Sequence, residues 1–291
     1  MPSKTQSTTW RAPLPDSLLV PAPLPAQANC TTPAIPDIGE FVWCSVFSPR
    51  IYDGNQSIVI RLNSWPTREW LCSTAGFLGK TETSFFVLGP NGLEIRWFAA
   101  DHEVPLCGHC ALAVNAVLLP MLQDGELREV VNLPGRLWLS RQGGDPYITL
   151  KAISLAPIAN ETVPLGVKVV QAFDAGRDYL VILEDEETLR KFDPRTAGIE
   201  RLAKIGCIIS SPSKSGTAAF RFFAPRVGIQ EDRASGSVVP ALMQYWARGT
   251  PGDHTFSQES GHDIKIRARW LEDKVALTGE VLEFARGKIS L

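Results

Sequence analysis

Two short segments place a glycine and polar neighbours directly before an apolar stretch. Cys107-Gly108-His109 opens the stretch 108–119, and Ser235-Gly236-Ser237 opens the stretch 237–246. Glycine lets the chain turn sharply into a helix, and the first backbone N–H groups of a helix have no partner within it. Such an end carries about half a positive charge and binds anions. The two segments therefore predict a pair of anion-binding helix starts, and the competing interpretation is two glycines that only form tight turns.

Ionisable residues surround both glycines. Those near the first are Asp101, His102, Glu103 and His109, and those near the second are Glu231, Asp232 and Arg233. Glu82 stands at the start of a strand-like segment. A carboxyl group at a strand end, next to a cleft that excludes water, can have its pKa raised by desolvation and act as a general acid or base. The competing interpretation of Glu82 is an acid on a surface loop.

The residues Cys107-Gly108-His109-Cys110 also form a C-x-x-C motif. At a helix start this spacing is typical of redox-active thiols, because the helix end lowers the pKa of the first cysteine. The second glycine segment contains no cysteine, which weakens a thiol-based mechanism. Six cysteines in 291 residues are too few for a disulfide framework, so we expect mostly reduced thiols. No second C-x-x-C or H-x-x-x-H accompanies the motif, so no metal is expected.

The segments around these residues predict strands separated by turns, with a few helices between them. In the first half we expect strands at 41–47 and 57–62, a hairpin of 84–88 and 93–99, and helices at 65–77 and 108–119. In the second half we expect a helix at 237–246 and strands at 179–183, 207–210, 217–223, 264–270, 274–277 and 281–284. His254 and His262 are expected in a solvated polar loop.

A short sequence pattern that occurs twice in the chain indicates two similar lobes. Arg96-Trp97-Phe98-Ala99 precedes the first glycine segment, and Arg221-Phe222-Phe223-Ala224 precedes the second at nearly the same distance. The pattern predicts an α+β fold of two pseudo-symmetric lobes, each a barrel-like, mostly antiparallel sheet around a central helix. We expect a Pro-rich extension at 1–38, a first lobe at 39–157 and a second at 158–291, whose final strand either stays there or returns to the first lobe.

Composition excludes several classes of protein. Lys and Arg number 29 against 31 Asp and Glu, a balance that does not favour a nucleic-acid partner. No apolar run approaches the roughly 18 residues of a membrane-spanning helix, and no signal peptide is evident, so we expect a cytoplasmic protein without a membrane partner. Nucleotide, flavin and metalloprotease motifs are absent, so we expect no cofactor.

Five segments resemble the PhzF-like family of phenazine biosynthesis proteins, which share the diaminopimelate epimerase fold. The resemblance covers about residue 41 to the C-terminus. The segments are Asp53-Gly54-Asn55, residues 81–85, residues 106–109, residues 221–225 and residues 228–237. Arg233 stands where the family usually has proline, and it either pairs with a substrate carboxylate or lies in a solvated loop. Cys110 stands where the family usually has a small residue.

The resemblance implies an isomerase that needs neither metal nor cofactor and forms a homodimer. It assigns Glu82 as the residue that moves a proton, with His109 and Asp232 as its catalytic partners. It further implies that Gly108, Gly236 and Ser237 bind the substrate. Together these expectations describe an isomerase or epimerase that moves a proton between carbons of a small carboxylated, amino-acid-derived metabolite. The alternatives are a related cyclase, dehydratase or double-bond isomerase of a secondary-metabolite pathway, and a non-catalytic ligand-binding homologue.

Overall fold

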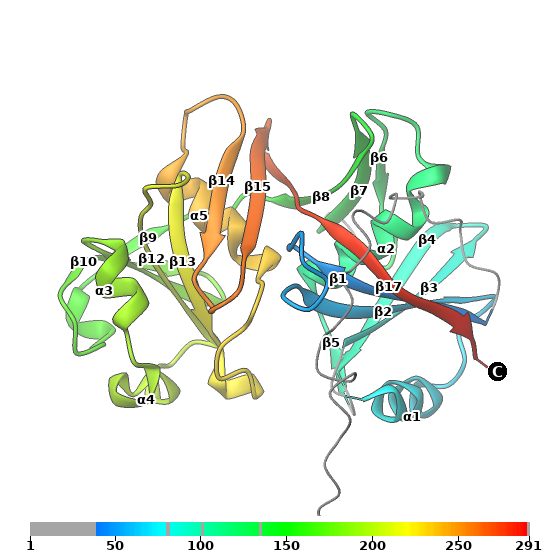
Figure 1. Cartoon of the computed structure of the whole chain (residues 1–291), viewed down its shortest axis with the longest axis horizontal. Helices are drawn as coiled ribbons and strands as arrows, with labels where there is room; N and C mark the ends of the chain where they lie inside the picture. Colours follow the sequence, from blue (N-terminus) through cyan, green and yellow to red (C-terminus); the bar gives the residue numbers. More distant parts are fainter. Residues whose placement is uncertain (1–38, 80–81, 100–101, 134–135, 290–291) are drawn as a thin grey trace, which may run out of the picture. The chain divides into compact units, whose positions relative to one another are not determined.

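The first of two β-sheets pairs the first and the last strand of the described residues. The computed structural model describes residues 39–79, 82–99, 102–133 and 136–289. Strand β1 pairs with β2 on one side and with the C-terminal strand β17 on the other, so β17 lies alongside β1 in Figure 1. The six strands lie in the order β17 (Val281–Lys288), β1 (Glu40–Val46), β2 (Asn55–Leu62), β3 (Glu82–Gly89), β4 (Gly92–Ala99) and β5 (His102–Val104).

The second sheet has eleven strands and is also mostly antiparallel. Parallel pairing occurs between β2 and β3 in the first sheet, and in the second between β11 and β12 and between β13 and β14. In spatial order its strands are β6 (Leu127–Glu129), β7 (Leu137–Gln142), β8 (Asp145–Lys151), β16 (Lys274–Thr278), β15 (Ile264–Leu271), β14 (His254–Gln258), β13 (Ala218–Phe223), β12 (Gly206–Pro212), β11 (Asp178–Leu183), β10 (Val169–Ala175) and β9 (Ala156–Ile158).

Helix α2 (Gly108–Leu118) forms the centre of the first half. All eleven of its residues are buried, and it contacts β1, β2 and β3 of the first sheet and β7 and β8 of the second. Its run of Ala, Leu and Val suits a helix that is covered on every side. The amide nitrogen of Asn115 is satisfied inside the protein, because Nδ2 donates to the carbonyl oxygens of Ser140 and Tyr147, at 2.9 and 2.7 Å.

Helix α5 (Val239–Trp246) has the corresponding place after the second glycine segment. It continues the 3₁₀ turn η6 (Gly236–Val238), buries residues 239–243 and packs on β15 and β16. The remaining helices cover the outside. They are α1 (Arg68–Leu78), α3 (Glu186–Lys191), α4 (Pro194–Ala197) and the 3₁₀ turns η2 (Leu119–Met121), η3 (Asn160–Thr162), η4 (Ile199–Arg201) and η5 (Pro225–Val227).

The predicted α+β fold with two interior helices is confirmed, and most expected strands lie within two residues of the observed ones. The prediction for His254 was wrong, because this residue begins β14 and is buried. The Pro-rich extension at 1–38 and Asp101 lie outside the described residues. The lobe boundary between residues 157 and 158 stays a prediction.

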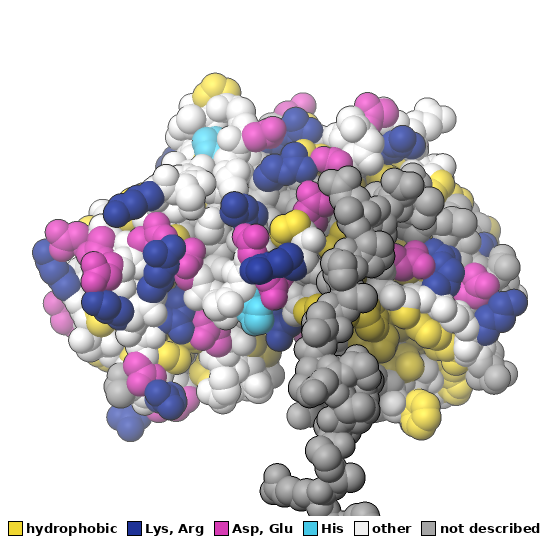
Figure 2. Space-filling view, in the orientation of Figure 1, with side chains coloured by type: hydrophobic (Ala, Val, Ile, Leu, Met, Phe, Trp, Pro, Cys, Tyr) yellow, Lys and Arg dark blue, Asp and Glu magenta, His cyan; other side chains and the backbone are white. Residues whose placement is uncertain are grey.

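The described surface mixes charges of both signs. Figure 2 shows Lys and Arg side chains interspersed with Asp and Glu across the face that carries β10 to β13. No helix among the described residues is long and apolar enough to cross a membrane.

Candidate active site

The two predicted helix starts meet. A Cβ atom on Gly108 would lie 2.7 Å from the backbone nitrogen of Ser237 and 3.0 Å from the carbonyl carbon of Gly236. A Cβ atom on Gly236 would lie 2.9 Å from the ring of Phe47. Neither glycine has a positive φ angle, so both are needed for close approach and not for an unusual turn. The start of α2 and the start of η6 therefore lie in direct contact.

Glu82 lies beside this junction. It is the first residue of β3, and its Oε2 atom is 3.5 Å from Nε2 of His109, the second residue of α2. The His109 side chain is 7% exposed and the Glu82 side chain is 27% exposed. The ring is thus held inside the protein while the carboxylate keeps access to a ligand.

Glu82 and His109 each stabilise the charged form of the other, the carboxylate of Glu82 and the protonated ring of His109. Burial alone raises the pKa of Glu82, but the hydrogen bond and positive charge of His109 outweigh burial and hold it below the ordinary value. Burial alone lowers the pKa of His109, but the hydrogen bond and charge of Glu82, with the charge of Asp232, raise it above the ordinary value. The expected upward shift for Glu82 was therefore wrong. The carboxyl group is therefore ionised at neutral pH.

Asn55 connects His109 with Asp232. Its Nδ2 donates to Oδ1 of Asp232 at 2.8 Å and to the carbonyl oxygen of Ala234 at 3.0 Å, and it lies 3.4 Å from Nδ1 of His109. The Asp232 carboxylate also accepts from Oγ of Ser235 at 2.5 Å. Asn55 was missed as a site residue, although the Asp-Gly-Asn segment pointed to it.

Gln258 holds the loop that carries Asp232. Its Nε2 donates to the carbonyl oxygen of Asp232 at 2.6 Å, and its Oε1 accepts from the backbone N–H of Ser235 at 2.6 Å. The side chain is 1% exposed. This role was missed, because Gln258 lies on β14, which was not predicted.

Three consecutive charged residues point to three different places. Asp232 enters the site, whereas Glu231 pairs with Arg221 through two bonds of 2.7 and 2.8 Å. Arg233 donates to the carbonyl oxygen of Tyr52 at 3.1 Å and thereby ties two loops together.

The Arg221–Glu231 pair lines a separate cavity of about 620 Å³ that also includes Phe192, Asp193, Pro194, Arg195, Ile199, Glu200, Pro225 and Gln230. Glu103, next to the first glycine segment, is bound to Arg96 at 2.6 and 2.7 Å.

Ser237 is half-buried at the junction of the helix starts and accepts from Nη2 of Arg177 at 3.3 Å. Arg177 follows β10 and is itself held by Oδ2 of Asp178, at 3.0 Å from Nε and 2.8 Å from Nη2. It was missed because the turn between β10 and β11 lies 60 residues from Ser237 in the chain. An arginine beside a helix start adds positive charge to the same place.

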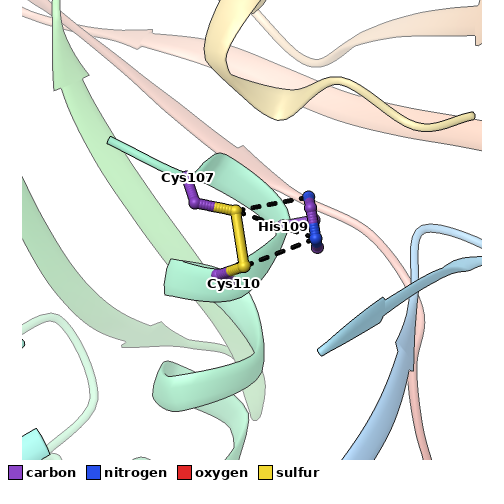
Figure 3. A group of neighbouring side chains, drawn as sticks. All are labelled: Cys107, His109 and Cys110. Carbon is purple, nitrogen blue, oxygen red and sulfur yellow. Dashed lines mark hydrogen bonds between the residues drawn. A yellow bond between two sulfur atoms is a disulfide. The ribbon is translucent and has the colours of Figure 1, made fainter. Parts of the chain in front are cut away.

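Cys107 and Cys110 are joined by a disulfide, so the expectation of reduced thiols was wrong for this pair. Cys44, Cys72 and Cys207 are free. The donor atoms of Cys107, His109 and Cys110 lie within 4.8 Å of one another (Figure 3). Cysteine binds a metal ion as a thiolate, which neither cysteine can supply while the disulfide is formed. In that state this group offers a metal ion only the imidazole of His109. It is the one such cluster among the described residues.

Comparison with known proteins agrees with this fold. The family model described as phenazine biosynthesis-like protein, PhzC-PhzF, matches residues 44–280. The chain is 32% identical over 259 residues to a protein of Pseudomonas aeruginosa named as an uncharacterized isomerase, covering 87% of this chain and 98% of the relative.

Two solved structures show the same fold. A PhzF-family phenazine biosynthesis protein of Enterococcus faecalis matches with a TM-score of 0.70 at 25% identity, over 87% of this chain and 99% of that one. A hydroxyproline epimerase of Agrobacterium vitis, solved with trans-4-hydroxy-L-proline bound, matches with a TM-score of 0.53 at 12% identity, over 87% of this chain and 92% of that one. The resemblance seen in the sequence is confirmed, and the chain belongs to the phenazine biosynthesis-like protein family, in a group whose relatives include proteins named as isomerases.

Proposed function

We propose that the protein is an isomerase that moves a proton between carbons of a small carboxylated metabolite, without a metal or cofactor. The observation that carries the proposal is the Glu82–His109 pair beside two helix starts that meet at Gly108 and Gly236. A base next to an anion-binding place is what removal of a proton from a carbon beside a carboxylate requires.

Glu82 acts as the base. His109 keeps its carboxyl group ionised in the resting protein, so Glu82 can accept a proton from the substrate carbon. The electron pair left by that C–H bond moves into the substrate carboxylate and produces an enediolate. Glu82 then returns the proton to a conjugated carbon on the same face of the substrate, and the base is regenerated. Inversion at the original carbon would instead need a second proton donor on the opposite face, a role that falls to Asp232.

The helix starts bind the negative charge that develops. The N–H groups after Gly108 and Gly236 face the substrate carboxylate, and Ser237 adds a hydroxyl group. Their dipoles are fixed by packing, so they need little rearrangement as charge accumulates. Asp232, held by Asn55 and Ser235, accepts a hydrogen bond from a substrate amine or shares the proton transfer.

The class of substrate follows from this charge arrangement. A carboxylate suits the helix ends, and an ammonium group suits Asp232, so an amino-acid-derived metabolite fits both. The hydroxyproline epimerase of the same fold was solved with an amino-acid carboxylate bound, which supports this class.

Hydrogen exchange tests the proposal. The protein is incubated in D2O with a small-molecule extract of the organism that encodes it, and the extract is analysed by mass spectrometry. We expect one carboxylated metabolite to gain a single deuterium at carbon. A metabolite that binds the protein without exchanging would instead support a non-catalytic ligand-binding protein.

A further inference from the structure

A disulfide between two cysteines lies at the start of α2, and the proposed proton transfer does not use it. Cys107 is the N-cap residue of α2, and Cys110 is three residues further on, in its first turn. The two Cα atoms are 5.3 Å apart, within the range in which a bridge forms without backbone movement. Both thiol groups can therefore form and break this bond while α2 stays in place.

His109 lies beside the disulfide and faces both sulfur atoms. Its Nδ1 atom is 3.5 Å from Sγ of Cys107, and its Nε2 atom is 3.4 Å from Sγ of Cys110 (Figure 3). The same Nε2 atom faces Glu82 at 3.5 Å. Other polar groups around the ring are Asn55, Asp232 and the backbone of Gln56. The oxidation state of the sulfurs thus acts on the ring that pairs with Glu82.

We propose that Cys107 and Cys110 form a redox-active site that exchanges electrons with dithiols, and that its state sets which group His109 binds. The proposal concerns the cysteine pair and the imidazole, and it holds whether or not Glu82 transfers a proton to carbon.

The exchange with a dithiol proceeds in two steps. A thiolate of the dithiol attacks Sγ of Cys107, the S–S bond breaks, and Cys110 leaves with the electron pair and takes a proton from Nε2 of His109. The ring then regains a proton from the solvent. The second thiol of the dithiol, after losing its proton, attacks its own sulfur in the mixed disulfide and releases Cys107 as a thiolate. The cysteine pair gains two electrons, and the dithiol loses them and becomes a cyclic disulfide.

Cys107 is the sulfur that a reductant reaches, because it is 7% exposed whereas Cys110 is 0% exposed. The helix start and the His109 ring both stabilise a thiolate at Cys107. A disulfide sulfur has no charge, whereas this thiolate competes with Glu82 for the N–H groups of His109. Reduction should therefore weaken the Glu82–His109 pair and make the ring harder to deprotonate.

The first test follows the cysteines. The full chain is equilibrated with mixtures of reduced and oxidised dithiothreitol, then alkylated under denaturing conditions and mapped by peptide mass spectrometry. We expect alkylation of Cys107 and Cys110 to be lost together, in one two-electron transition, as the mixture becomes oxidising. Cys72, which is free and partly exposed, should stay alkylated throughout. Complete alkylation of Cys107 and Cys110 in every mixture would overturn the proposal.

The second test follows His109 by NMR of the ring nitrogens in the oxidised and the reduced protein. We expect its titration midpoint to move to higher pH on reduction in the wild type and in Cys72→Ser. Cys110→Ala and Cys110→Ser cannot form the bridge, so their midpoints should not respond to the reductant. An identical midpoint in both states of the wild type, or an equal response of the Cys110 variants, would overturn the coupling to His109. No turnover is measured, so failure here is separate from failure of the isomerase proposal.

Discussion

The Nε2 atom of His109, on α2, lies 3.5 Å from the Oε2 atom of Glu82, at the start of β3. The two residues come from different elements of the same half of the molecule, and the buried histidine keeps the more exposed carboxylate ionised. This contact couples the packing of α2 to the chemistry of the proposed base.

The stability of the protein should depend on pH through this pair. The pKa of Glu82 is lowered from its ordinary 4.5, so its contribution is present above 4.5 and is lost as pH falls through the folded-state pKa. The pKa of His109 is raised from its ordinary 6.5, so its contribution is present below 6.5 and is lost as pH rises through the folded-state pKa. The pair therefore stabilises the fold most between pH 4.5 and 6.5.

Urea unfolding of the wild type and of Glu82→Gln across this range measures the effect. The difference in free energy of unfolding should be largest inside the window and decline on both sides. Glu161→Gln, which changes an exposed glutamate, serves as the control. A difference for Glu82→Gln that is constant from acid to alkaline pH would contradict the ion pair.

Gly108→Ala should destabilise the protein by about 1–3 kcal/mol, because the added methyl group would overlap the backbone of Ser237 at 2.7 Å. Gly89→Ala is the matched control, since its nearest atom would be Cγ1 of Val87 at 3.9 Å. Denaturant unfolding compares the two. Equal midpoints would show that the helix starts do not need glycine for their approach.

Asn55→Ala should lower the free energy of unfolding by about 1–3 kcal/mol, because Oδ1 of Asp232 and the carbonyl oxygen of Ala234 lose their donor. It should also reduce turnover of the substrate identified by deuterium exchange, since Asp232 is no longer held. Asn63→Ala, at an exposed position before α1, should change neither quantity. Full activity of Asn55→Ala would contradict the proposal that turnover requires Asp232 to be held in place by Asn55.

Local sequence patterns were sufficient for the two helix starts and for most strands. The apolar run after Gly108 and the turn between Gly89 and Gly92 are short-range signals, and both elements formed where expected. Strand β14 was missed because His254, Ser257 and Gln258 are polar. The partners of His254 and Gln258 that favour burial, Thr217 and Asp232, lie 37 and 26 residues away in the chain.

The site was less predictable than the fold, for a related reason. The sequence could not show that Glu231, Asp232 and Arg233 diverge to three partners, because those partners lie on other elements. Nor could it show that His109 would reverse the effect of burial on Glu82. That outcome depends on a contact between residues 27 positions apart, across a strand and a helix.

The comparison of wild type with Glu82→Gln in deuterium exchange tests the central claim most directly. Both proteins, with Glu161→Gln as the control, are incubated in D2O with the metabolite that the wild type labels, and folding is checked by circular dichroism. We expect exchange by Glu82→Gln to fall about 100- to 10,000-fold, because an amide cannot accept the proton, while the control retains the wild-type rate. A folded Glu82→Gln protein that labels the metabolite at the wild-type rate would contradict Glu82 as the base.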